Sequence, residues 1–191
     1  MNLEKPKFLE SLTIRASDER DLDAIRAIYE IAVLTGTGTF ETEVPSLEEM
    51  ARRRVEVLGR KLPWLVAEAS GQILGYAYAN YFRPRLAYRF CLEDSIYLHP
   101  DAQGHGLGKL MLAELIARCE HLGARQMLAV IGDAENQGSI GIHRALGFSH
   151  TGVLKSAGWK FGRWLDVVMM QRELGQGAQN SPESSPESHP Q

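Results

Sequence analysis

The sequence lacks several features that mark specialised classes of protein. Only two cysteines, Cys91 and Cys119, occur among 191 residues, which excludes a disulfide framework and a zinc site built from paired Cys-x-x-Cys motifs. No run of about 18 apolar residues occurs, and the N-terminal residues lack the apolar core of a secretion signal. We therefore expect a cytoplasmic protein that neither crosses nor binds a membrane.

An excess of positive charge is also absent. The sequence holds 21 Lys and Arg against 24 Asp and Glu, a formal net charge of −3, with a pI near 6.1. Such a chain has no basic field to attract DNA or RNA, so we expect no nucleic-acid partner. What is present is typical of one globular domain: a mass of 21.3 kDa with 44% hydrophobic and 24% charged residues.

The two ends of the chain differ in composition from the middle. Residues 175–191 are rich in Gly, Gln, Ser, Pro and Glu, and they contain too few apolar groups for burial to offset the entropy of ordering. We expect a disordered tail over these residues, a flexible lead-in over residues 1–11, and one folded domain over residues 12–174.

Hydrophobic periodicity predicts an α/β domain with the element order β-α-α-β-β-β-α-β-α-β-β. The predicted strands are residues 12–15, 64–69, 73–81, 92–98, 127–131, 149–154 and 166–172, and the predicted helices are residues 18–35, 46–58, 107–119 and 137–146. Hairpins together with crossover helices indicate a mixed sheet. Ser46 and Glu49 have the spacing of a capping box, and we interpret Arg52, Arg53 and Arg54 behind them as a solvated helix face.

The densest chemical signal is the glycine-rich turn at residues 103–109, Gln-Gly-His-Gly-Leu-Gly-Lys, between a predicted strand and a predicted helix. Glycines let a ligand approach the backbone, and the N–H groups at a helix start favour an anion such as a phosphate. A tight turn without a ligand is the alternative. A nucleotide P-loop is excluded because Leu110 stands where the motif needs Ser or Thr, and a dinucleotide fingerprint would need a third glycine in place of Lys109.

The spacing Gln/Arg-x-x-Gly-x-Gly/Ala, matched by Gln103, Gly106 and Gly108, resembles the acyl-CoA pyrophosphate loop of the Gcn5-related N-acetyltransferases, the GNAT family. The resemblance covers residues 13–172 and includes the predicted strand 127–131, Asn136 with Ser139, and Leu-Gly-Phe at 146–148. Within the family, residues 92–100, 139–143 and 158–167 are most similar to the phosphinothricin and methionine sulfoximine N-acetyltransferases. The resemblance implies the GNAT fold, a mixed and mostly antiparallel central sheet flanked by helices.

The resemblance also implies an enzyme that uses acetyl-CoA as cosubstrate, needs no metal, and acetylates the α-amino group of a small, glutamate-like amino acid by direct transfer. The implied acetyl-CoA-binding residues are Ile96, Tyr97, Leu98, Gln103, Gly104, His105, Gly106, Leu107, Gly108, Lys109, Asn136, Ser139 and His143. Asn136 alone could simply be a helix N-cap. The alternatives are a GNAT enzyme for a protein N-terminus, a polyamine or another amine, and a non-catalytic CoA-binding module.

Glu93 and His143 are the candidate catalytic residues. An amine with a pKa of about 8 is mostly an ammonium ion at neutral pH and must lose a proton before it attacks, and a carboxylate within reach can serve as the general base. Glu93 lies in a predicted central strand, where an acid needs a partner or a task, so a structural ion pair is the alternative. His143 stands where many family members have a tyrosine that serves the departing thiolate; a core histidine is the alternative.

The acceptor side is implied by the same resemblance. Arg83 and Arg85 offer guanidinium groups that suit carboxylate or phosphinate oxygens, with solvated loop arginines as the alternative. The implied acceptor-binding residues are Phe40, Arg83, Pro84, Arg85, Tyr88, Glu93, Asp94, Ser95, Lys160 and Trp164. Family members commonly form dimers with the acceptor pocket near the interface, so the resemblance also implies a homodimer.

Overall fold

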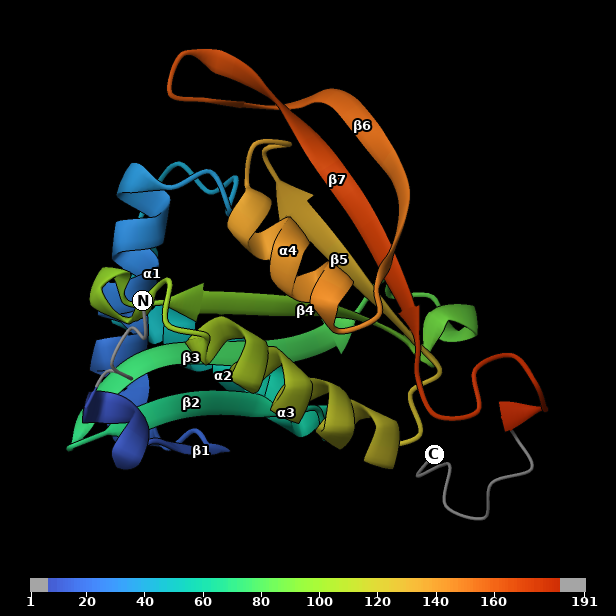
Figure 1. Ribbon diagram of the computed structural model, residues 1–191, viewed down its shortest axis with the longest axis horizontal. Helices are drawn as coiled ribbons and strands as arrows, with labels where there is room; N and C mark the ends of the chain where they lie inside the picture. Colours follow the sequence, from blue (N-terminus) through green and yellow to red (C-terminus); the bar gives the residue numbers. More distant parts are fainter. Residues whose placement is uncertain (1–6, 183–191) are drawn as a thin grey trace, which may run out of the picture.

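Residues 7–182, the part of the chain that the computed structural model describes, contain one open seven-stranded sheet in the order β1-β2-β3-β4-β5-β7-β6 (Figure 1). All neighbouring strands are antiparallel except β4 and β5, which are parallel. The predicted mixed, mostly antiparallel α/β fold and its element order are confirmed. The strands are β1 (Thr13–Ala16), β2 (Trp64–Ala69), β3 (Gln72–Tyr81), β4 (Cys91–Leu98), β5 (Gln126–Gly132), β6 (Ser149–Lys160) and β7 (Arg163–Glu173).

Helices cover both faces of this sheet. Helices α1 and α2 pack against each other and on β3, whereas α3 and α4 pack on the opposite face, next to β4 and β5 (Figure 1). Every helix within residues 7–182 is too short or too polar to cross a membrane. The helices are α1 (Leu22–Thr35), α2 (Leu47–Gly59), α3 (Leu107–His121) and α4 (Gln137–Ala145), with 3-10 turns at Lys7–Glu10, Glu19–Asp21, Leu86–Tyr88 and Pro100–Ala102.

A row of aromatic rings fills the core between the sheet and α1. Trp64 stacks on Tyr78 at 4.3 Å between ring centroids, and Tyr76 stacks on Tyr97 at 5.2 Å. Tyr97 in turn meets Tyr29 of α1 edge-on at 4.9 Å. Because side chains on a strand alternate between faces, Tyr76 and Tyr78 of β3 both reach this side of the sheet. The aromatic row therefore fixes α1 over β3 and β4.

The second helix begins as the sequence predicts, but its arginines do not share one face. The Ser46 hydroxyl accepts a hydrogen bond from the Glu49 N–H at 3.1 Å, which confirms the N-cap. The solvated face predicted for the arginine triplet is wrong for Arg54, which is 8% exposed and donates to the hydroxyl and carbonyl oxygens of Ser17. Successive helical residues point about 100° apart, so only Arg52 of the three is fully exposed.

The last two strands are longer than predicted, since β6 continues to Lys160 and β7 begins at Arg163. The sequence prediction ended β6 at Leu154 and began β7 at Asp166. A carboxylate of β7 explains why the hairpin continues: Asp166 accepts hydrogen bonds from the Ser156 N–H at 2.9 Å and from Lys155 Nζ at 2.7 Å. The side chain of Asp166 thus bridges the bulge where the register of β6 shifts.

Strands β4 and β5 diverge, and the divergence positions the site. Their parallel pairing covers only Cys91–Glu93 against Gln126–Leu128. Beyond that point β4 continues to Leu98 with β3 as its partner, and β5 continues to Gly132 with β7. A wedge therefore opens between the two strands (Figure 1).

Both ends of the chain lie partly outside the described residues. The predicted lead-in is described from residue 7, and the predicted tail is described only to residue 182. Residues 175–182 follow β7 as turns, and Asn180 accepts a hydrogen bond from Arg125 at 2.9 Å. The domain boundaries and the disordered tail stay predictions.

Candidate active site

A cavity of about 1150 Å³ occupies the wedge between β4 and β5. Its walls are the carboxyl-terminal half of β4, the end of β5, the glycine-rich turn before α3, the first half of α4, and residues 36–40 between α1 and α2. From Asp94 onward, the edge of β4 that faces β5 has no strand partner. Backbone N–H and C=O groups on that edge can therefore pair with an extended ligand.

The glycine-rich turn has the geometry of an anion site. Gly104 and Gly106 have φ values of 77° and 84°, a left-handed conformation that glycine adopts without strain. Gly106 is the N-cap of α3, so the N–H groups of the following turn have no partner within the helix. A methyl group built on Gly108 would lie 3.4 Å from Leu98 and 4.0 Å from Ile96 of β4. The turn, the start of α3 and the end of β4 thus form one continuous surface that favours a phosphate.

Alternation along β4 gives the wedge two chemically different faces. Tyr97 points toward α1, as its edge contact with Tyr29 shows, and Glu93 lies on the same side because it is four residues earlier. Asp94 points the other way, toward α4, where it reaches His143. We call the side with α3 and α4 the glycine-turn face and the side with α1 the Glu93 face.

Glu93 is a half-buried carboxylate on the wall of the cavity, at the point where β4 and β5 part. Burial raises the pKa of Glu93, the charge of Asp94 raises it further, and the Arg83 guanidinium opposes the shift. A carboxylate with a raised pKa is a stronger base than an exposed one, which suits removal of a proton from an amine.

His143 is held by hydrogen bonds at both ring nitrogens. Nδ1 lies 2.7 Å from the carbonyl oxygen of Ser139, and Nε2 lies 3.0 Å from Oδ2 of Asp94. A carbonyl oxygen only accepts, so Nδ1 carries a hydrogen, and the contact with Asp94 requires a second one between the two side chains. Both side chains are 2% exposed. Burial lowers the pKa of His143, but the hydrogen bond and charge of Asp94 outweigh it and raise the pKa, which favours an imidazolium beside a carboxylate.

Helix α4 begins at a cap on the cavity wall. Oδ1 of Asn136 accepts a hydrogen bond from the Ser139 N–H at 3.1 Å, so the capping role of Asn136 is present. Asn136 and Ser139 also line the cavity. The same two side chains therefore fix the start of α4 and face the space where a ligand would lie.

Residues 36–46, the segment between α1 and α2 that we call the strap, close the Glu93 face. The buried Lys160 ammonium of β6 donates to the carbonyl oxygens of Gly36 and Thr39, each at 2.8 Å. Burial lowers the pKa of Lys160, and the Glu41 charge partly opposes this. On the other side of the strap, the Thr39 hydroxyl meets the Tyr29 hydroxyl at 2.8 Å.

Most predicted acetyl-CoA-binding residues line the cavity; His105 and Leu107 do not. Of the predicted acceptor residues, Phe40, Glu93, Asp94 and Ser95 line it. Lys160 lies behind the strap, and the remaining predicted residues are exposed outside the cavity: Arg83, Pro84, Arg85, Tyr88 and Trp164. Sequence reasoning missed several wall residues, namely Thr37, Gly38, Thr39, Tyr78, Gly132, Asp133 and Val167.

The chain is similar to a known protein family and to solved structures. The GNAT acetyltransferase domain matches residues 14–169. The crystal structure of a GNAT superfamily phosphinothricin acetyltransferase from Sinorhizobium meliloti in complex with AcCoA superposes with a TM-score of 0.89. The two chains are 49% identical, and the match covers 92% of this chain and 95% of that one.

Two relatives show the same likeness at the level of sequence. A phosphinothricin N-acetyltransferase of Alcaligenes faecalis is 53% identical over 171 residues, which cover 90% of this chain and 87% of that protein. An L-methionine sulfoximine/L-methionine sulfone acetyltransferase of Salmonella typhimurium is 36% identical over 169 residues, which cover 87% of this chain and 97% of that protein.

Proposed function

This chain belongs to the GNAT acetyltransferase family and is an N-acetyltransferase, and from that premise we propose that its acceptor is a small amino acid of glutamate-like shape. Acetyl-CoA supplies the acetyl group. The proposed acceptors are L-phosphinothricin, L-methionine sulfoximine and L-methionine sulfone, the compounds named for the relatives from Alcaligenes faecalis and Salmonella typhimurium.

The observation that carries the proposal is the two-faced wedge. The glycine-turn face offers helix N–H groups for a pyrophosphate and an unpaired strand edge for an extended chain. The Glu93 face offers a half-buried carboxylate at the narrow end of the same cavity. A thioester that enters along one face would therefore meet an amine that enters along the other.

In the proposed reaction, Glu93 takes a proton from the acceptor ammonium, directly or through one water molecule. The neutral amine nitrogen then forms a bond to the thioester carbonyl carbon. As the C–S bond breaks, the nitrogen loses its second proton to the departing sulfur, so that CoA leaves as the thiol. The negative charge on sulfur develops on the glycine-turn face, where His143 as an imidazolium supplies positive charge while its two N–H groups stay bonded to Ser139 and Asp94. Asp94 holds His143 in place through Nε2.

The anionic end of the acceptor needs a cation, and the Arg83 loop is the candidate. Arg83 is exposed outside the cavity, but its charge acts on Glu93. Arg85 is two residues away and also exposed. Lys160 was expected to bind the acceptor directly, but its ammonium donates to carbonyl oxygens of the strap. In the proposal it contributes positive charge near the acceptor and no direct contact with it.

We also propose a cytoplasmic homodimer. Trp159, Phe161 and Trp164 at the turn of the β6–β7 hairpin are each more than half exposed, and clustered exposed aromatic side chains favour association. Light scattering after gel filtration should give twice the mass of one chain, and a mass of one chain would contradict the dimer.

A panel of amines tests the acceptor. The purified chain, acetyl-CoA and each amine are incubated, and the acetylated product is identified by its mass. We expect L-phosphinothricin and L-methionine sulfone to react far faster than L-glutamate, spermidine or a peptide with a free N-terminus. Equal rates for spermidine would favour the broader amine acetyltransferase, and no product with any amine would favour a CoA-binding module.

A further inference from the structure

Two glycines on the Glu93 face have no backbone reason to be glycine. Gly132 ends β5 and Gly158 lies in β6, and neither has a positive φ. A side chain at either position would therefore suit the backbone, and glycine in a strand interior weakens it. The reason must lie in what approaches these two positions.

What approaches them is the aromatic ring of the strap. A methyl group built on Gly158 would lie within 3.0 Å of three ring carbons of Phe40. One built on Gly132 would lie well within 3.0 Å of the carbonyl oxygen of Thr37, also in the strap, and 2.9 Å from Cε1 of the Phe40 ring. Distances below 3.0 Å essentially never occur at real Cβ atoms. Gly132 and Gly158 thus form a flat seat for the Phe40 ring, and the ring also lines the cavity.

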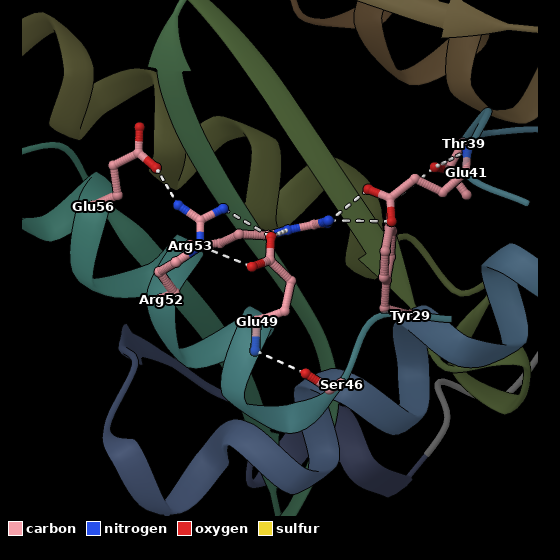
Figure 2. Close-up of polar contacts among 8 residues, drawn as sticks. All are labelled: Tyr29, Thr39, Glu41, Ser46, Glu49, Arg52, Arg53 and Glu56. Carbon is pink, nitrogen blue, oxygen red and sulfur yellow. Dashed lines mark hydrogen bonds and ion pairs between the residues drawn. The ribbon is translucent and has the colours of Figure 1, made fainter. Parts of the chain in front are cut away.

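The strap cannot simply retreat from this seat, because it is tied on both sides. Lys160, two residues after Gly158 on the same face of β6, donates to the carbonyl oxygens of Gly36 and Thr39. Directly after Phe40, Arg53 of α2 donates to both carboxylate oxygens of Glu41, at 2.6 and 3.3 Å (Figure 2). The positions of both neighbours of Phe40, Thr39 and Glu41, are therefore fixed.

The Arg53 anchor is itself braced by α2. Arg53 Nε donates to Glu49 at 2.7 Å, and Glu49 also accepts from Arg52 at 2.7 and 2.8 Å (Figure 2). Tyr29 of α1 holds Thr39 from the side, through their hydroxyl groups (Figure 2). Charges from one helix and a hydroxyl from another thus hold one edge of the strap, while β6 holds the other edge.

We propose that the seat formed by Gly132 and Gly158 sets how large an acceptor the Glu93 face admits, with Lys160 as the residue that positions the strap on it. This inference rests on the proposed function. A side chain at position 158 displaces the Phe40 ring away from β6 and into the cavity, because the strap ends do not move. The space beside Glu93 shrinks, while the glycine-turn face is untouched.

Gly158→Ala tests the seat, with Gly152→Ala as the matched control in the same strand, where an added methyl group meets nothing within 4 Å. The measurement is kcat/KM for L-methionine sulfone and for S-methyl-L-cysteine sulfone, which is one methylene shorter. In Gly158→Ala we expect the ratio of the longer to the shorter acceptor to fall about 10-fold, the effect of one methylene in a tight pocket. The acetyl-CoA Kd stays at the wild-type value, and Gly152→Ala changes neither quantity.

Phe40→Leu tests whether the Phe40 ring transmits the effect of the added methyl group. Combined with Gly158→Ala it should return the acceptor ratio toward the wild-type value, because the shorter leucine leaves room for the added methyl group. If Gly158→Ala alone fails to fold, this double variant should fold, and Phe40→Leu alone should raise the ratio. An unchanged ratio in Gly158→Ala, or an equal loss for both acceptors, overturns the seat; a wild-type chain that acetylates neither sulfone overturns the proposed function instead.

Discussion

The two faces of the wedge are built in different ways. The glycine-turn face takes its anion site from seven consecutive residues, 103–109, and its second wall from the start of α4. The Glu93 face combines a strap residue, a β4 carboxylate and the glycines of β5 and β6, so its members come from positions as far apart as Phe40 and Gly158. In the proposed function, binding of the cosubstrate thus depends on a local motif, whereas acceptor choice depends on how distant segments pack.

The largest expected effect separates the two faces by chemistry. Glu93→Gln removes the base but keeps the shape of the side chain, so we expect kcat at neutral pH to fall about 10²–10⁴-fold. The acetyl-CoA Kd should not change, because Glu93 lies on the opposite side of β4 from the glycine turn. Steady-state rates and calorimetry measure the two quantities. A Kd that rises with the loss of kcat would show that the faces are not independent.

The Asp94–His143 pair should dominate stability on the glycine-turn face. Asp94→Ala leaves a buried imidazole without its partner, and breaking such a pair costs about 3–5 kcal/mol in the free energy of unfolding, measured with urea. Asp94→Asn should cost much less at high pH, since an amide can donate to Nε2 of a neutral ring. Equal losses for the two variants at high pH would exclude a neutral His143 ring that carries its hydrogen on Nδ1 and accepts at Nε2.

The same pair predicts a direction of pH dependence. The folded-state pKa of His143 is raised, so its contribution to stability is fully present below its unfolded pKa of about 6.5. That contribution is lost as the pH rises through the raised folded value. The gap in stability between wild type and Asp94→Asn should therefore narrow above neutral pH, and a gap that widens would contradict the ion pair.

Gly106→Val should damage the glycine-turn face and leave the Glu93 face intact. A left-handed φ of 84° costs a residue with a side chain about 1–2 kcal/mol, and the branched side chain also blocks the approach of a phosphate. We expect the acetyl-CoA Kd to rise at least about tenfold by calorimetry. Gly59→Ala, where an added methyl meets nothing within 4 Å, is the control. An unchanged Kd in a folded Gly106→Val protein would remove the phosphate site.

The smallest effect concerns the tie between the strap and β6. Lys160→Met removes two hydrogen bonds made by a charged donor, but it also removes the cost of burying the ammonium. We therefore expect the free energy of unfolding to fall by about 1–3 kcal/mol. The acceptor KM should rise and the acetyl-CoA Kd should not. Lys155→Met, at a side chain that is 76% exposed, should stay within about 0.5 kcal/mol. Identical behaviour of the two lysine variants would show that the strap does not depend on Lys160.

The glycine-turn face is built mainly from consecutive residues and the Glu93 face from residues far apart in the sequence, and this difference explains which features the sequence predicts. Element order, the fold and the lining role of most residues in the glycine turn follow from contiguous patterns, because turn geometry and helix starts are local. The Asp94–His143 pair joins residues 49 positions apart, and nothing local distinguishes it from an acid in a strand and a histidine in a helix. The sequence therefore assigns Asp94 to the acceptor and His143 to the thiolate without pairing them.

The predicted acceptor residues show the same limit. Lys160 looks like a ligand for an anion by its charge, but its ammonium meets two backbone carbonyl oxygens of a strap 120 positions earlier. Gly132 and Gly158 carry no chemistry that a sequence pattern would single out, and the strap above them explains their identity: the Phe40 ring over both, and the Thr37 carbonyl oxygen over Gly132. Steric complementarity between distant segments is absent from any local pattern.

The most direct test of Glu93 as the base in the wedge is the pH dependence of kcat for wild type and Glu93→Gln with L-phosphinothricin, from about pH 6 to about pH 10. The raised pKa of Glu93 places loss of wild-type activity on the acidic side, as the carboxylate takes up a proton. The variant should approach wild type at high pH, where the acceptor amine is already neutral and needs no base. If kcat of Glu93→Gln is lower than that of wild type by the same factor at every pH, or equals it at pH 7, Glu93 is not the base.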